Sequence, residues 1–203
     1  MQRTCVHGVL SDPVPLTSGM PQGSILGPKG YLMYVSPIFK IAHSHGINIH
    51  MYADDTQLYL TFVPSEWHSA RCKMEACIAE LRKWLSENCL KLNDNKTEIM
   101  ILGQPNLVCK IEGDLEIRIG GCTIKHSSVI RNIGAMLDSE MKMLDQVHNV
   151  CRSCYASLNS LGRIRKYLCD SSMEILVHAF ITCKVDNLNS LLSGIPDYAL
   201  HRV

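Results

Sequence analysis

Several absences in the 203-residue sequence limit what the chain can be. The net charge is only +1, so no overall basic field marks a nucleic-acid binder, and any such contact has to come from local patches. No apolar run reaches the ~18 residues that span a membrane, and no signal peptide is present. No internal repeat, low-complexity tract or long linker occurs. Because 46% of the residues are hydrophobic, we expect a folded, soluble, intracellular protein without a membrane segment.

Cysteine, in contrast, is plentiful, with ten residues scattered along the chain. Disulfide scaffolds are usually small, secreted and loop-rich, whereas this chain has long helical periodicities, so we expect reduced thiols. The pair Cys151-x-x-Cys154 beside His148 has the spacing of zinc ligands, but both cysteines lie on an apolar helical stripe and no second pair completes a tetrahedral site. A core role is therefore favoured. Three cysteines of an earlier predicted helix are also interpreted as core or surface thiols rather than ligands: Cys72, Cys77 and Cys89.

Two adjacent carboxylates, Asp54 and Asp55, separate two segments with strand periodicity. Apolar residues occupy alternate positions in 47–53 and in 57–62, the pattern of half-buried strands, so a hairpin is predicted. No Lys or Arg lies within ten residues of the pair, and hard cations such as Mg²⁺ prefer carboxylate oxygens. Aspartate is also a favoured turn residue, and taken alone the pair more often marks an ordinary turn.

A glycine-rich segment, residues 18–28, precedes this hairpin. Such loops let the backbone approach a ligand closely, and a following helix N-terminus attracts phosphate. Apolar residues with helical spacing then run over 31–42 and are interrupted by Pro37, which predicts a kinked helix. From spacing alone, a plain loop and core helix are the favoured interpretation.

In combination, the loop 18–28 and the Tyr52–Asp55 motif strongly resemble the reverse transcriptases of non-LTR (LINE-type) retrotransposons. The palm of these enzymes carries the same loop, then a helix, then a YADD sequence on a hairpin. Further similarity to the same open reading frames occurs in four downstream segments, residues 84–93, 96–98, 131–138 and 176–180. The resemblance thus covers nearly the whole chain.

This resemblance implies an RNA-directed DNA polymerase that uses an RNA template, a DNA primer and dNTPs. Asp54 and Asp55 would bind Mg²⁺, with Mn²⁺ as the alternative ion. The implied reaction is an in-line nucleotidyl transfer in which two metal ions stabilise the attacking and the leaving oxygens.

The resemblance also assigns roles to residues around the carboxylates. Tyr52 would lie beside the primer terminus, and Pro21, Gln22 and Gly23 would shape the pocket for nucleotide and template. Lys96 matches the lysine of a later family motif and would neutralise or protonate the pyrophosphate leaving group, with a solvated lysine as the alternative.

The implied fold class is α+β, a partial polymerase palm with an antiparallel sheet packed on helices, followed by a small helical thumb-like region. We divide the chain into a partial palm (1–105), a strand meander similar to a primer grip (106–140) and the thumb-like region (141–203). Local patterns predict an amphipathic helix that begins at Pro64 and Ser65, with Ser65 as its N-cap, and carries its apolar stripe over 74–89. They also predict strands at 108–111, 115–119 and 123–124, and a helix from Leu144 to Gly162. A last helix is expected to begin with a capping box formed by Ser171 and Glu174.

Arg163, Arg165 and Lys166 form a small basic group after the first of these C-terminal helices. They would contact template phosphates, which positions a nucleic acid without reading its sequence. A solvated helix end is the alternative.

One departure from the family bears on activity. Family members carry a further metal-binding aspartate on a strand well upstream of the glycine-rich loop, whereas only seventeen residues precede Ser18 here, and Asp12 lies in an expected turn. We therefore expect the isolated chain to be an inactive reverse transcriptase fragment. The alternatives are a non-catalytic module that binds nucleic acid or protein and, with less support, a metal-dependent phosphoesterase or nuclease.

Overall fold

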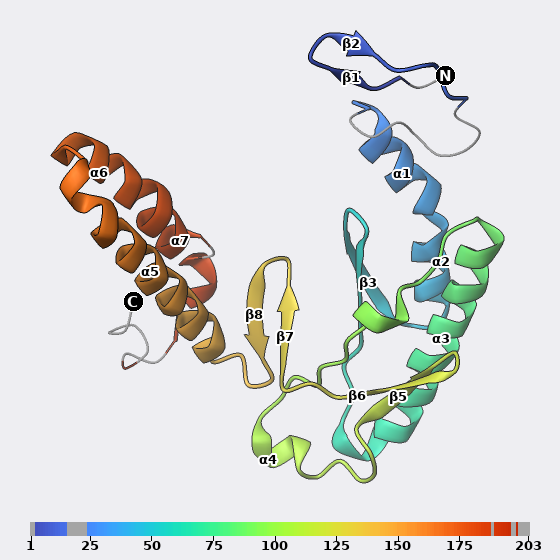
Figure 1. Cartoon of the computed structure of the whole chain (residues 1–203). Coiled ribbons are helices and arrows are strands. Elements are labelled where there is room, and N and C mark those ends of the chain that lie inside the picture. Colours follow the sequence, from blue (N-terminus) through green and yellow to red (C-terminus); the bar gives the residue numbers. More distant parts are fainter. Residues whose placement is uncertain (1–2, 16–23, 188, 196–197, 199–203) are drawn as a thin grey trace. The chain divides into compact units, whose positions relative to one another are not determined.

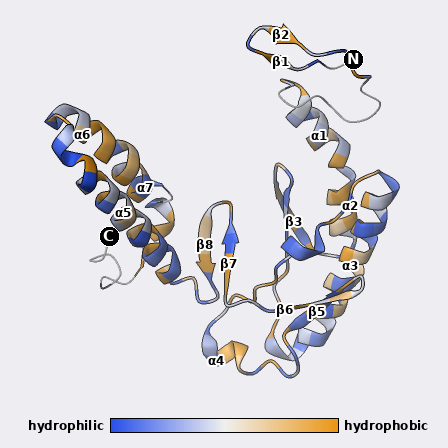
Figure 2. Ribbon diagram, viewed as in Figure 1, coloured by the Kyte–Doolittle hydropathy of each residue, from blue (hydrophilic) through white to orange (hydrophobic). Residues whose placement is uncertain are grey.

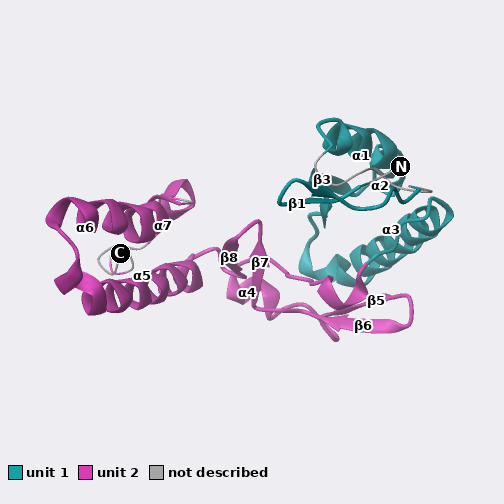
Figure 3. Ribbon diagram, turned by 45° about the horizontal axis from the view of Figure 1, so that its top comes forward, with its two compact units in different colours: residues 1–92 teal, residues 93–203 magenta. Residues whose placement is uncertain are grey.

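The structure, a computed structural model, describes residues 3–15, 24–187, 189–195 and 198 (Figure 1). The chain divides into two compact units, residues 1–92 and 93–203 (Figure 3). Both units combine two-stranded antiparallel sheets with helices, so the predicted α+β class is confirmed. Within these described ranges, none of the helices has both the length and the apolar character required to cross a membrane.

Unit 1 begins with a small hairpin, continues with two helices and a second hairpin, and ends with a long helix. Its elements are β1 (Cys5–Val6), β2 (Val9–Leu10), α1 (Gly27–Val35), α2 (Pro37–Ser44), β3 (Asn48–Tyr52), β4 (Asp55–Tyr59), a 3₁₀ turn (Pro64–Glu66) and α3 (Trp67–Glu87).

The predicted kinked helix is confirmed as the pair α1 and α2, separated at Ser36. Pro37 supplies no backbone N–H, so it cannot continue the hydrogen-bond ladder of α1, but it suits the first turn of α2. The Ser36 hydroxyl donates a hydrogen bond to the Met33 carbonyl at 2.9 Å, which satisfies an acceptor at the break.

The core of unit 1 forms where α2 packs against α3 and β3. Ile47 and Ile49, at alternate positions before and within β3, point into it, as the strand periodicity predicts. The predicted amphipathic helix is confirmed as α3, whose Cys77 and Leu81 are buried in the same core. Its N-cap residue is Glu66 rather than Ser65, and the helix ends at Glu87, so Cys89 lies outside it. The remaining buried members come from α1 and α2: Val35, Ile38 and Ala42.

The C-terminus of α3 is tied to α1. The Tyr34 hydroxyl donates to the Asn88 carbonyl at 2.7 Å, and the rings of Tyr34 and Trp84 lie 6.4 Å apart. The Asn88 side chain in turn donates to the Trp84 carbonyl at 2.8 Å. These contacts fix the helix that precedes the acidic hairpin against the long helix that follows it.

Unit 2 contains two further hairpins and a helical region. Its elements are α4 (Pro105–Val108), β5 (Glu116–Ile119), β6 (Cys122–Lys125), β7 (Val129–Asn132), β8 (Ala135–Asp138), α5 (Leu144–Ile164), α6 (Asp170–Val177), a π-helical segment (His178–Thr182) and α7 (Cys183–Asp186), with 3₁₀ turns at Asp94–Lys96, Arg165–Tyr167 and Asn189–Leu192.

The hairpin β5–β6 confirms two of the predicted strands, but the prediction of a strand at 108–111 is wrong. Pro105 starts the short helix α4 instead, and the Gln104 carbonyl accepts hydrogen bonds from Leu107 and Val108 at 2.8 and 3.1 Å. The hairpin β7–β8 was not predicted as strands. Its turn places Ile133 at φ 46° before Gly134, and a β-branched residue in that region gives no turn signal.

The helical region contains two long helical stretches with polar and apolar faces (Figure 2). Helix α5 begins at Leu144 as predicted, but Gly162 lies inside it rather than at its end. The prediction of a capping box formed by Ser171 and Glu174 is wrong as well, because α6 begins at Asp170 and its N-cap residue is Cys169. From α7, the ammonium group of Lys184 donates to α5, to the Ser153 carbonyl at 3.2 Å and the Ser157 hydroxyl at 2.7 Å.

Candidate functional site

The acidic pair lies at the tip of the hairpin β3–β4. Tyr52 and Asp55 are the closing cross-strand pair, and Ala53 and Asp54 form the two-residue turn between them. Ala53 has φ 55°, a left-handed conformation that is uncommon for a residue with a Cβ. The predicted hairpin is thus confirmed, and Asp55 belongs to its second strand.

The hairpin has one core face and one open face. Ile49 and Leu58 are paired across the strands on the core side. Since cross-strand partners lie on the same face, Tyr52 shares the open face with Asp55. Tyr52 is 60% exposed, so its ring is available to a ligand that reaches the turn.

Asp54 and Asp55 are both exposed, and neither forms an ion pair with another described residue. One neighbour does interact with the pair: Tyr31 of α1 lies within electrostatic range of Asp54. Burial against the core raises the pKa of the Tyr31 hydroxyl, and the negative charge of Asp54 raises it further. Sequence reasoning missed this neighbour. Its position directly after the glycine-rich loop was the available signal.

The carboxylates suit a hard divalent cation in part. Oxygen ligands are what Mg²⁺ prefers, and exposed carboxylates leave coordination positions for water and substrate phosphates. Within the ranges that the structure describes, however, no group of three or more His, Cys, Asp or Glu side chains is arranged to hold a metal ion. Asp54 and Asp55 therefore supply two ligands of an incomplete set.

The other residues expected near the carboxylates lie outside the described residues or in unit 2. Pro21, Gln22 and Gly23 lie outside the described residues, and the structure resumes at Ser24 before α1. Lys96 is exposed in the 3₁₀ turn Asp94–Lys96, which belongs to unit 2, whereas the carboxylates belong to unit 1.

The three residues of the expected basic group, at the end of α5 and just after it, differ in their contacts. Arg163 is exposed in the last turn of α5, where no other described residue pairs with it. Arg165 instead forms an ion pair with Asp170, and the Lys166 ammonium lies 4.9 Å from the centroid of the Tyr167 ring. Arg163 and Lys166 are the members with a free charge for an external phosphate.

One further basic residue was missed by sequence reasoning. Arg152 is exposed on α5, about three turns before Arg163. Residues 146–169 contain no Asp or Glu, so no acidic residue of this run offsets Arg152 or Arg163, whereas Arg165 pairs with Asp170 just beyond it. The acid-free run was the available signal.

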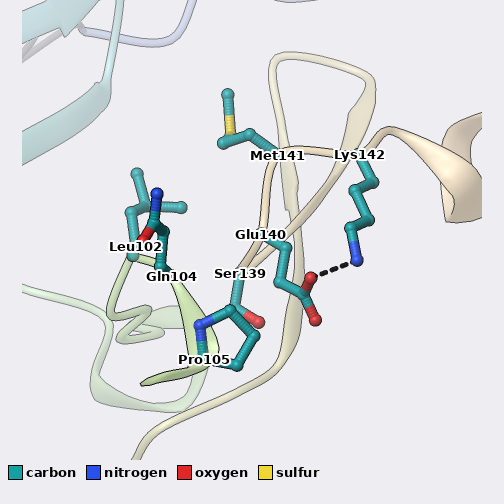
Figure 4. A pocket seen from close by; sticks show the side chains of 8 residues that line it. Leu102, Gln104, Pro105, Ser139, Glu140, Met141 and Lys142 are labelled. Atoms are coloured by element: carbon teal, nitrogen blue, oxygen red, sulfur yellow. Dashed lines mark ion pairs between the residues drawn. The ribbon is translucent and has the colours of Figure 1, made fainter. Parts of the chain in front are cut away.

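A cavity of 520 Å³ lies in unit 2, between segments 102–105 and 139–142 (Figure 4). Its charged lining residues, Glu140 and Lys142, form an ion pair with each other. None of the residues expected to act in catalysis lines this cavity. Glu140 is the single acidic residue among the lining residues, so this cavity offers no second carboxylate pair.

Residues 4–149, well over half of the chain, match the sequence model of a family described as reverse transcriptase (RNA-dependent DNA polymerase). The chain belongs to the reverse transcriptase family. No curated protein and no solved structure matches it significantly. Reverse transcriptases act on a nucleic-acid template and primer with nucleotide substrates, and in general they use a divalent metal ion.

The family match includes the acidic hairpin and Lys96, and it ends within α5, before the basic group at 163–166. Within this match, the hairpin presents an exposed pair of carboxylates, and carboxylate oxygens are ligands that divalent ions such as Mg²⁺ prefer. The interpretation of α5 as a basic surface rests on its charge pattern alone.

Proposed function

We propose that this chain is the C-terminal part of the reverse transcriptase of a non-LTR (LINE-type) retrotransposon, with Asp54 and Asp55 as metal ligands for nucleotidyl transfer. The observation that carries the proposal is the exposed carboxylate pair, without an ion pair to any described residue, at the tip of a hairpin inside the family match. Two adjacent carboxylates in this position would repel each other in the absence of a cation.

Bound Mg²⁺ or Mn²⁺ would stabilise the developing charge on the attacking and leaving oxygens in a two-metal reaction. Tyr52, on the open face beside Asp55, would contact the primer terminus. Pro21, Gln22 and Gly23 would shape the nucleotide pocket.

The proposed roles in unit 2 follow the same resemblance. Lys96 would act on the pyrophosphate leaving group. The region 106–140, with its two hairpins, would serve as the primer grip, and 141–203 as the thumb-like region, with 1–105 as the partial palm.

We further propose that the purified 203-residue protein does not extend a primer by itself. Two carboxylates hold two divalent ions weakly, and the part of the chain that the structure describes gathers no third acidic ligand at the hairpin. The test is Mg²⁺- and Mn²⁺-dependent extension of oligo(dT) on a poly(rA) template. Extension that is lost in Asp54→Asn but kept in Asp114→Asn, an exposed aspartate of unit 2, would overturn the proposed inactivity.

The metal site itself has a separate test that needs no activity. Electron paramagnetic resonance of free Mn²⁺ should show weak binding by the wild-type protein, and Asp54→Asn or Asp55→Asn should weaken it at least several-fold. Asp114→Asn should leave it unchanged. Equal Mn²⁺ binding by all four proteins would refute the assignment of the hairpin carboxylates.

A second candidate function, nucleic-acid binding without catalysis, is favoured by the acid-free run of residues 146–169 with its exposed Arg152 and Arg163. Each lost phosphate contact lowers the slope of log K against log salt by about 0.9. We expect Arg152→Gln and Arg163→Gln each to reduce the slope for an RNA–DNA hybrid by about this amount. Arg165→Gln is the matched control, because Arg165 already pairs with Asp170.

A further inference from the structure

His68 and Cys72, two residues of types that can bind metal ions, face each other across one turn of α3. Their positions are i and i+4, and the His68 Nε2 and Cys72 Sγ atoms lie 3.8 Å apart. Both residues are exposed, whereas Trp67, Ala70 and Cys77 of the same helix are buried. The pair therefore lies on the solvent side of α3, where an ion can reach it.

The distance between the two atoms is close to the one that a shared zinc ion requires. Zn–S bonds are about 2.3 Å and Zn–N bonds about 2.0–2.1 Å, so a tetrahedral angle places the sulfur and nitrogen about 3.6 Å apart. The observed separation is 3.8 Å. Small side-chain rotations close this gap, and the helix backbone does not have to move.

The donor chemistry selects the class of ion. Thiolate and imidazole are ligands for Zn²⁺ and other thiophilic cations, whereas Mg²⁺ prefers carboxylate and water oxygens. The nearby Arg71 does not oppose the ion with a free charge, because its Nε donates to Glu75 Oε1 at 3.1 Å. Lys73 is exposed and follows Cys72 in sequence, but adjacent residues on a helix do not face each other.

We propose that His68 and Cys72 form a two-ligand binding site for Zn²⁺ on the surface of α3. The Cys72 thiol releases its proton to solvent as the S–Zn bond forms, neutral His68 coordinates through Nε2, and water fills the remaining positions. This proposal departs from the interpretation of Cys72 as a plain core or surface thiol. The site is independent of the proposed polymerase chemistry at Asp54 and Asp55.

The number of ligands bounds the affinity. Among the described residues, no third His, Cys, Asp or Glu joins the pair to complete a metal-binding group. If two of four ligands supply half of the binding free energy of a complete structural site, the dissociation constant is on the order of micromolar to a few hundred micromolar. Binding weakens as the pH falls, because protons compete for both ligands.

The test uses the whole chain and resolves each of its ten cysteines. The reduced protein is alkylated with iodoacetamide with and without Zn²⁺, and the modification rate of every cysteine is followed by peptide mass spectrometry. We expect saturating Zn²⁺ to slow the alkylation of Cys72 at least tenfold, while Cys122, an exposed cysteine of unit 2, is unaffected. Mg²⁺ at the same concentration should not protect Cys72.

His68→Ala separates a two-ligand site from simple thiol binding. This variant should lose the protection of Cys72, and His43→Ala, which removes another exposed histidine of unit 1, should keep it. Circular dichroism confirms that each variant folds. Protection that persists in His68→Ala, or that is absent in the wild-type protein at millimolar Zn²⁺, would overturn the proposal.

Discussion

Replacing Cys89 by glycine should stabilise unit 1, because Cys89 ends α3 in a left-handed conformation with φ 57°. The Leu90 N–H donates to the Leu85 carbonyl at 2.8 Å across this residue, the hydrogen bond of a Schellman motif. This conformation destabilises the folded state by about 1–2 kcal/mol when an L-residue adopts it. Glycine removes that cost, but its greater freedom in the unfolded chain lowers the free energy of unfolding by about 0.5–1 kcal/mol. The Cys89 side chain is exposed, so little packing is lost. We expect a gain of roughly 0.5–1 kcal/mol in the free energy of unfolding.

The assay can be restricted to unit 1. Both tryptophans of the chain, Trp67 and Trp84, lie on α3, so tryptophan fluorescence during urea unfolding reports this unit. With a urea dependence of about 1 kcal/mol per molar, typical of a domain near 90 residues, Cys89→Gly should raise the unfolding midpoint by roughly 0.5–1 M.

The matched control is Cys89→Ala, which removes the sulfur but keeps the Cβ in the left-handed conformation. This variant should leave the midpoint nearly unchanged. If alanine stabilises as much as glycine, or if glycine does not stabilise at all, the backbone conformation of Cys89 does not limit the stability of unit 1.

Two predictions concern groups with a perturbed pKa. Hydrogen bonds from Ser171 and then Ser172 lower the pKa of the exposed Cys169 thiol to about 7, so iodoacetamide at pH 7 should modify it faster than the other exposed cysteines. Ser171→Ala should slow this reaction, and an unchanged rate would contradict the stated cause. Burial lowers the pKa of His126 below its ordinary value of 6.5, and His126 Nδ1 accepts a hydrogen bond from the Ile101 N–H at 3.1 Å. The folded state therefore holds neutral His126, and its contribution to stability is present above pH 6.5 and is lost as the pH falls through the lowered pKa. The free energy of unfolding, measured with urea between pH 7.5 and 5, should decline as the pH falls, and the decline should be smaller in His126→Gln. An equal decline in both proteins would contradict this.

Local sequence patterns determined several elements of the fold. Strand alternation around Asp54 and Asp55 specified the hairpin and its core face, because side chains of a strand alternate between two faces. Pro37 specified the break between α1 and α2, because a missing N–H and a fixed ring act within one turn. The family motif at the hairpin could also be read directly, since its residues are contiguous.

Tertiary structure decided what depends on partners distant in sequence. Residues 108–111 were expected as a strand because of their apolar side chains, yet Pro105 and the Gln104 carbonyl start a helix at α4 and residues 108–111 join no ladder. The hairpin β7–β8 forms although Ile133 is strained, because β8 packs on α5 and the buried Gln146 side chain accepts the Met136 N–H at 2.9 Å.

The neighbours of the candidate sites were decided in the same way. Tyr31 reaches the vicinity of Asp54 only because α1 packs on the core that also holds β3. His68 and Cys72 are four residues apart and could have been paired from the sequence once the helix was assigned, but their 3.8 Å separation depends on side-chain conformation. Sequence periodicity specifies which face a residue occupies, whereas the distance between two groups depends on how packed elements place them.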